Sequence, residues 1–107
     1  MSSDDDSDTI FKALADRKRR AILDALKDEP KTTGQLVALF PQIDRCTVMQ
    51  HMKVLETAGL IVARKEGRER WNHLNALPIK SIHDRWIGDY ARNAAGLMSR
   101  LETELKA

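Results

Sequence analysis

The chain has 107 residues, of which 42% are hydrophobic and 32% charged, and its formal net charge at pH 7 is +2. This length fits a single domain with a modest core, which an obligate dimer would enlarge. No apolar run approaches the roughly 20 residues of a membrane span, no signal-peptide pattern starts the chain, and a single cysteine excludes an internal disulfide framework. We therefore expect a cytoplasmic protein with no membrane partner.

The net charge is unevenly distributed along the chain. Four aspartates lie within residues 1–8 and contribute −4, which leaves +6 on the remainder. Because residues 1–8 are mainly Ser and Asp, we expect a disordered acidic tail there. The remainder is basic enough to be attracted to the phosphates of a nucleic acid.

Two short amphipathic helices are predicted after the tail. The first covers residues 9–15, and its inward side is formed by Ile10, Phe11 and Leu14. Asp16 is a good N-cap for the second, which runs through Asp28. The buried side of the second helix is formed by Ala21, Ile22, Ala25 and Leu26.

Residues 17–20, Arg-Lys-Arg-Arg, form the densest positive cluster and stand at the start of the second helix. Four cations there could clamp a phosphate. However, cations at a helix N-terminus oppose the helix dipole, and such runs often form a solvated face. We favour the solvated face and keep the clamp as the alternative.

A helix-turn-helix is predicted over residues 32–59. Thr32 and Gln35 form a capping box at the start of its first helix, and Pro41 ends that helix. Asp44 is a good N-cap for the next helix, and Gly59 supplies its stop because glycine tolerates the left-handed conformation. In such a motif the second helix enters the major groove of DNA.

The second helix of this motif has two different faces. Its apolar side carries Val48, Met52 and Leu55, and the opposite side carries Cys46, Met49, Gln50 and Lys53. That outer face has no carboxylate in its first two turns, which suits the base edges and phosphates of a DNA groove. Taken alone, the two helices fit any small helical domain equally well.

A β-hairpin follows, and it favours the DNA-binding interpretation. Residues 60–63 are apolar, Gly67 marks the turn, and cations surround the tip. A hairpin directly after a recognition helix is a wing. Pro78 then suits the first turn of a final helix over about residues 78–104. Its apolar stripe is formed by Ile79, Ile82, Trp86, Tyr90, Ala94, Leu97, Leu101 and Leu105.

These residues resemble the ArsR family of dimeric bacterial repressors. The matching segments cover most of residues 9–75 in the family's order and spacing, and they are Phe11–Asp16, Arg20–Asp24, Thr47–Leu55, Ala58–Ile61 and Gly67–Arg68. The resemblance implies a mainly α fold with a small β-hairpin, in the order α-α-α-α-β-β-α. It also implies a DNA-binding unit over residues 9–77 and a dimerisation helix over residues 78–107.

The resemblance and the helix geometry together give a set of expected DNA contacts, which are Arg45, Cys46, Thr47, Met49, Gln50, Lys53, Arg64 and Arg68. Gln50 can bracket adenine, and Met49 offers a thymine methyl only apolar contact. Lys53 should hold a phosphate, while Arg68 should reach a phosphate or the minor groove. Arg64, Lys65 and Arg70 add positive charge to the wing. The expected dimer contacts are Ile82, Trp86, Tyr90, Leu97 and Leu101.

Other functions have less support in the sequence. Many ArsR-type proteins sense metals, but one cysteine and three histidines outside ligand spacing disfavour a metal site here. We expect no cofactor and no enzyme activity, because the chain shows no nucleophile–base pairing or Gly-rich phosphate loop. The partners expected are double-stranded DNA, as a pseudo-palindromic operator, and a second copy of the chain; an inducer is unknown. Two alternatives stay open, namely a protein-interaction module that does not read DNA and a redox-responsive repressor that uses Cys46.

Overall fold

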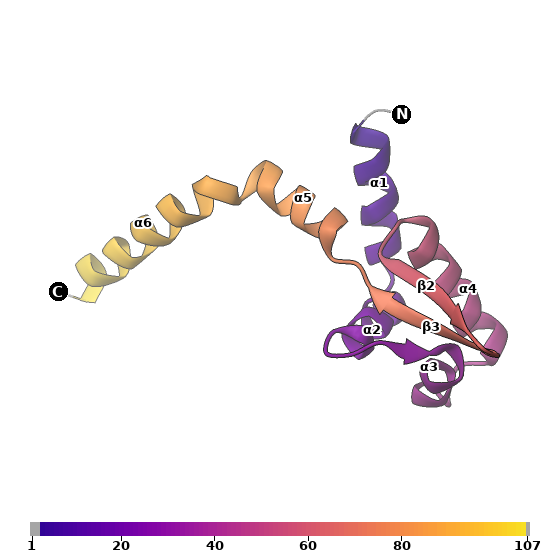
Figure 1. Ribbon diagram of the computed structural model, residues 1–107. Coiled ribbons are helices and arrows are strands. Elements are labelled where there is room, and N and C mark those ends of the chain that lie inside the picture. Colours follow the sequence, from indigo (N-terminus) through magenta and orange to yellow (C-terminus); the bar gives the residue numbers. More distant parts are fainter. Residues whose placement is uncertain (1–2, 107) are drawn as a thin grey trace.

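The computed structural model describes residues 3–106, and for residues 3–5, 88–92, 94, 95 and 106 it describes the backbone only. The first four helices and a small antiparallel sheet form one body, and the last two helices lead away from it (Figure 1). The long axis of the molecule measures 60 Å because of this extension. The mainly helical winged helix-turn-helix predicted from the sequence is confirmed, with one additional strand and one additional helix break.

Helix α1 (Ser3–Leu14) begins earlier than predicted. The expectation of a disordered tail over residues 1–8 does not hold for residues 3–8, which are helical, while residues 1 and 2 lie outside the described part. Aspartates in the first turns of a helix interact favourably with its dipole. Helix α1 also lies against α5 (Leu77–Trp86). The inward side of α1 is formed by Ile10 and Ala13, whereas Phe11, predicted to face inward, is 45% exposed.

Helix α2 (Arg17–Leu26) begins at its predicted cap and ends two residues short of the predicted Asp28. The positive cluster at its start is not a uniformly solvated face. The Arg19 guanidinium donates to the carbonyls of Ala13 (2.7 Å) and Lys12 (2.9 Å), and that of Arg20 donates to the carbonyl of Leu14 (2.6 Å). The last carbonyls of a helix have no intrahelical partner, so these arginines cap the end of α1.

The helix-turn-helix consists of α3 (Thr33–Leu39) and α4 (Arg45–Thr57). The predicted capping box is present at the start of α3. The backbone N–H of Gln35 donates to Thr32 Oγ1 (3.1 Å), and the backbone N–H of Thr32 donates to Gln35 Oε1 (2.9 Å). The left-handed stop after α4 is also present, because Gly59 has a φ of 79°.

The core lies where α1, α2, α3, α4 and the first strand of the wing meet. Helix α4 contacts α2, α3 and β2 (Ile61–Glu66), and its predicted inner residues are buried. Leu36 of α3 is fully buried against them. The buried core comprises Ile10, Ala13, Ile22, Leu23, Leu26, Leu36, Val48, Met52, Leu55, Leu60 and Ile61.

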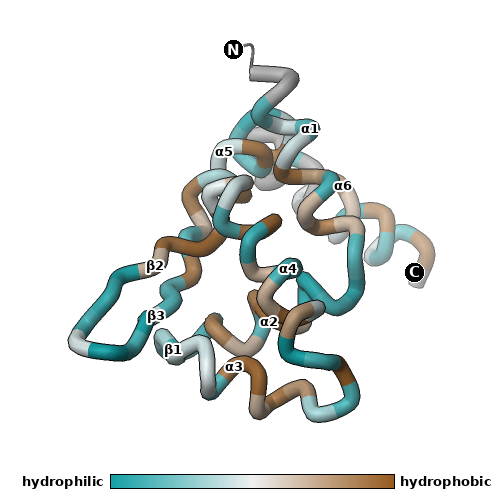
Figure 2. The backbone as a smooth tube through the Cα atoms, turned by 90° about the vertical axis from the view of Figure 1, so that its right-hand side faces the viewer, coloured by the Kyte–Doolittle hydropathy of each residue, from teal (hydrophilic) through white to brown (hydrophobic). Residues whose placement is uncertain are grey.

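The wing is formed by β2 (Ile61–Glu66) and β3 (Glu69–Leu74), joined at Gly67, which has a φ of 63°. Its base is hydrophobic and its tip hydrophilic (Figure 2). A third strand, β1 (Lys31–Thr32), was not predicted; it pairs with β3 on the side away from β2. Two residues are too few for a sequence pattern to reveal, so this strand follows from the tertiary fold.

Asn72 joins the wing to the helix-turn-helix. Its side chain is fully buried, and its amide nitrogen donates to the Lys31 carbonyl and to Thr33 Oγ1, both at 3.2 Å. Residue 72 also pairs with Lys31 across β1 and β3. One side chain therefore connects β3 with β1 and with the start of α3.

The predicted single C-terminal helix is two helices, α5 (Leu77–Trp86) and α6 (Gly88–Lys106), separated at Ile87. Gly88 at the break has a helix propensity about 1 kcal/mol poorer than alanine. The Trp86 ring stacks on Phe11, with 5.9 Å between ring centroids, which holds the end of α5 against α1. No helix within residues 3–106 combines the length and apolar character needed to cross a membrane.

Replacing Asn72 with leucine should lower the free energy of unfolding by about 1–3 kcal/mol. The leucine keeps the volume but leaves the carbonyl of Lys31 without its buried donor. Chemical denaturation monitored by circular dichroism measures this change. His73→Ala, at the exposed neighbouring position of β3, is the control and should change stability by less than about 0.5 kcal/mol. Equal effects of the two substitutions would contradict this role of Asn72.

Candidate nucleic-acid interface

The recognition helix α4 is started by Asp44. Its carboxylate accepts from the backbone N–H of Thr47 at 3.0 Å and from the Thr47 hydroxyl at 2.7 Å. These hydrogen bonds, the one from the Thr47 hydroxyl first, hold the pKa of the Asp44 carboxyl below its ordinary value of 3.8. The Thr47 hydroxyl, predicted to reach DNA, is therefore already bound to the cap, and its side chain is half-buried.

The remaining predicted contacts of α4 lie together on its exposed face. Arg45, Cys46, Gln50 and Lys53 are exposed, and Met49 is 46% exposed. This matches the two-faced helix expected from the spacing. Among the described residues, neither Arg45 nor Lys53 forms an ion pair with a carboxylate. The exposed face of α4 therefore offers two cations, an amide and two sulfur-bearing side chains.

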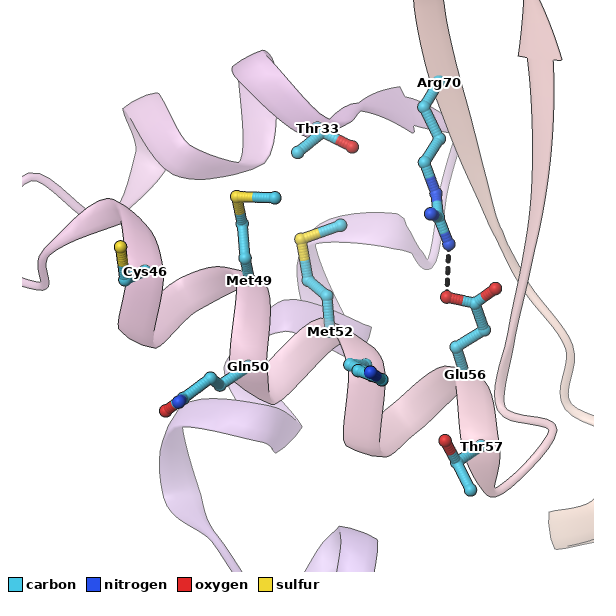
Figure 3. Close-up of a pocket in the computed structure, with 9 residues that line it drawn as sticks. Thr33, Cys46, Met49, Gln50, Met52, Glu56, Thr57 and Arg70 are labelled. Atoms are coloured by element: carbon cyan, nitrogen blue, oxygen red, sulfur yellow. Dashed lines mark hydrogen bonds and ion pairs between the residues drawn. The ribbon is translucent and has the colours of Figure 1, made fainter.

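Part of this face lines a groove of about 800 Å³. In Figure 3, Met49 and Met52 point from α4 toward Thr33, while Gln50 points to the other side of the helix. The groove is completed by residues that were not predicted to belong to the site, which are Thr33, Met52, Glu56, Thr57 and Arg70. They come from α3, α4 and β3, so no short-range pattern brings them together.

The cations of the wing lie in two different environments. Arg64 is 77% exposed in its side chain and lies 3.9 Å from the Glu66 carboxylate. Arg68 is exposed next to the turn glycine, as predicted. Arg70, which was expected only to add charge, instead donates a hydrogen bond to the Glu56 carboxylate of α4. Trp71 is half-buried.

His51 of α4 lies against α2. Its side chain is half-buried, and its Nδ1 is 3.3 Å from the Arg19 guanidinium. His51 is therefore packed against α2 instead of facing the groove. No group of three or more His, Cys, Asp or Glu side chains suited to a metal ion occurs among the described residues.

The predicted dimer contacts do not share one environment. Ile82 is partly buried against the core of its own chain. Trp86, Leu97 and Leu101 are 52%, 55% and 49% exposed, respectively. Tyr90 lies outside the residues whose side chains are described. The dimer contacts thus remain a prediction. Leu97 and Leu101 form an exposed apolar row on α6 that a second copy of the chain could cover.

Replacing Asp44 with asparagine should reduce the loss of stability on acidification. Because the pKa of Asp44 is lowered in the folded state, its ionised carboxylate stabilises the fold above its ordinary pKa, and this contribution is lost as the pH falls through the lowered value. Asparagine is an equally good N-cap without a charge.

Thermal unfolding at neutral pH and near pH 3 (about one unit below the ordinary aspartate pKa) measures this difference. Asp28→Asn, which changes an exposed aspartate outside the helices, is the control. A wild-type and an Asp44→Asn protein with the same acid sensitivity would rule out this contribution.

Comparison with known proteins agrees with the geometry. A family described as helix-turn-helix domain matches residues 14–64. The uncharacterized HTH-type transcriptional regulator YuzN of Bacillus subtilis (strain 168) is 36% identical over 86 residues, which is 75% of this chain and 94% of YuzN. The transcriptional repressor SdpR of the same organism is 33% identical over 66 residues, covering 62% of this chain and 72% of SdpR.

A solved structure extends the match to the whole fold. The crystal structure of an ArsR family transcriptional regulator superposes with a TM-score of 0.73 at 29% identity, covering 88% of this chain and 95% of that one. The match therefore includes the wing and a large part of the C-terminal helices as well as the helix-turn-helix. The chain belongs to the ArsR-type winged helix-turn-helix family and is a DNA-binding transcriptional regulator.

Proposed function

We propose that the protein is a homodimeric repressor that places two copies of α4 in successive major grooves of a pseudo-palindromic operator. The observation that carries this proposal is the exposed face of α4, where the cations Arg45 and Lys53 flank Gln50 and Met49. Side chains of this kind match the donors, acceptors and methyl groups of a major groove and the phosphates beside it. A transcriptional regulator acts on the chromosome, so we place it in the cytoplasm.

The roles divide by chemistry. Gln50 brackets adenine, Met49 contacts a thymine methyl, and Arg45 donates to guanine or to a flanking phosphate. Lys53 holds a phosphate. In the wing, Arg64 and Arg68 contact the backbone or the minor groove. The list of contacts is completed by Cys46 and Thr47, of which Thr47 acts mainly through its bond to the Asp44 cap.

A second copy of the chain is the partner that fits α6. Leu97 and Leu101 stand one turn apart on a helix that leaves the body, so the body covers neither (Figure 1). Phe11 and Trp86 add a second exposed apolar surface where α1 meets α5. An isologous dimer covers the same patch on both chains. The repressor role is supported by the similarity to SdpR, a transcriptional repressor.

Selection of bound fragments from a random DNA pool tests the proposal. A two-fold repeated motif with half-sites about one helical turn apart, roughly 34–36 Å, supports it. Binding should also weaken steeply with salt, because Lys and Arg displace counterions. Failure to enrich any sequence, together with a flat salt dependence, would point to a protein-interaction module and contradict the proposal.

Gln50→Ala and Lys53→Ala should affect DNA binding in different ways. Removing the amide relaxes sequence preference and costs about 1–3 kcal/mol at the contacted base pair. Removing the ammonium weakens binding to all sequences about equally. It also reduces the slope of log affinity against log salt concentration by about 1, because one phosphate contact is lost. Titrations of operator and of random duplex at several salt concentrations measure both effects. If both variants changed affinity without regard to sequence, the assignment of Gln50 to base recognition and of Lys53 to phosphate binding would be wrong.

Leu101→Glu should shift the protein from dimer to monomer, because the charge cannot be buried unpaired in an apolar interface. Analytical ultracentrifugation measures the shift, and operator affinity should fall with it. Ser99→Glu is the matched control, since it adds the same charge at an exposed position on another side of α6. An unchanged dimer in Leu101→Glu, with Ser99→Glu also dimeric, would remove α6 from the interface.

A further inference from the structure

We propose that the ion pair between Glu56 and Arg70 fixes the wing relative to the recognition helix, so that Arg70 is a positioning residue and not a phosphate contact. This inference rests on the proposed function, and it adds a determinant of specificity to it. The pair joins the last turn of α4 to β3, and its side chains are 44% and 47% exposed, respectively. Figure 3 shows the guanidinium reaching from the strand to the helix.

The strand register explains why Arg70 faces the helix. Across β2 and β3, Ile61 pairs with Leu74, Ala63 with Asn72 and Lys65 with Arg70. Paired residues share one face of a hairpin, and every second residue repeats that face. Ile61 and Asn72 are buried, so this face is the one that covers the core. Lys65 and Arg70 continue the same inner face beyond the end of the core.

This arrangement creates a charge conflict that α4 relieves. Two cations directly opposite each other across a strand pair repel, and Lys65 faces Arg70 in this way. Glu56 is the one carboxylate in the sequence of α4, and it binds Arg70. The acidic residue of the recognition helix is thus bound to a wing cation and kept off the half of the helix that meets DNA.

The pair also borders the space beneath the wing tip. A hollow of about 380 Å³ is lined by Glu56, Ala63, Lys65, Arg68 and Arg70. With Arg70 neutralised by Glu56, the cations of this hollow left to meet phosphate are Lys65 and Arg68. Exposed ion pairs contribute little to stability. We therefore expect the pair to set the angle between wing and helix. Its loss should change the ratio of operator to random-duplex affinity more than the melting temperature.

The salt dependence of binding to a random-sequence duplex separates positioning from contact. Glu56→Gln frees Arg70 to reach a phosphate, so the slope of log affinity against log salt should steepen by about 0.9. Glu69→Gln, which removes a carboxylate from the wing with the same change in net charge, should steepen it less. Arg70→Gln should leave the slope as in the wild type, whereas Arg68→Gln should flatten it by about 0.9.

Discrimination provides the second measurement. Glu56→Gln, Arg70→Gln and the double variant should each lower the ratio of operator to random-duplex affinity severalfold, and the double variant should return the slope to the wild-type value. If Arg70→Gln flattened the slope as much as Arg68→Gln, Arg70 would be a phosphate contact and the inference would fail. Unchanged discrimination in all three variants would overturn it as well.

Hydrogen exchange of the free protein keeps this test separate from the proposed function. Backbone amides of residues 65–70 should exchange faster in Glu56→Gln than in Glu69→Gln or the wild type, because the wing tip has lost its tie to α4. A wild-type protein that binds no duplex would contradict the proposed function alone. Equal exchange in all three proteins would contradict the proposed role of the Glu56–Arg70 pair, regardless of the DNA-binding results.

Discussion

The burial of one face of α4 is the constraint on which the rest of the structure depends. Val48, Met52 and Leu55 are 1%, 6% and 0% exposed, and each such side chain contributes about 1.5–3 kcal/mol on burial. Turning α4 about its axis would expose these residues and bury Lys53 without a partner, which is far more costly. The core therefore determines which residues face outward. The exposed face of α4 is thus formed by folding alone, and its composition follows from what the core leaves out.

The wing is positioned relative to the exposed face of α4 by two contacts, one near the base of the hairpin and one near its tip. Near its base, Asn72 is hydrogen-bonded to β1 and to the first residue of α3, so β3 follows any movement of the helix-turn-helix. Near its tip, Arg70 is bound to the last turn of α4. A hairpin held only at its base would pivot there, whereas one held near its base and near its tip has a fixed angle to the helix. These contacts connect the wing to the helix-turn-helix at both ends of the hairpin.

The parts of the fold that could be predicted from the sequence are those specified by neighbouring residues. The caps at Thr32 and Asp44 and the turn at Gly67 need only a few consecutive side chains, and all three are present. What could not be predicted depends on pairs distant in the chain, such as Asn72 with Lys31 or Phe11 with Trp86. For this reason Phe11 was assigned to the core and Arg70 to the general charge of the wing. The outer face of α4 was predictable because helical periodicity alone separates it from the buried face.

Contacts between residues distant in the chain also explain why net charge was a poor guide to the candidate DNA-binding site. The densest cluster of cations, at the start of α2, supplies Arg19 and Arg20 to the last carbonyls of α1, and Arg70 is bound to Glu56. Within the described part of the chain, the cations of α4 and the wing that form no ion pair are Arg45, Lys53, Lys65 and Arg68. They lie on α4 and the wing, the two elements that we propose contact DNA. Because these four cations are not neutralised by a carboxylate, a chain of net charge +2 can still present a basic face to phosphate.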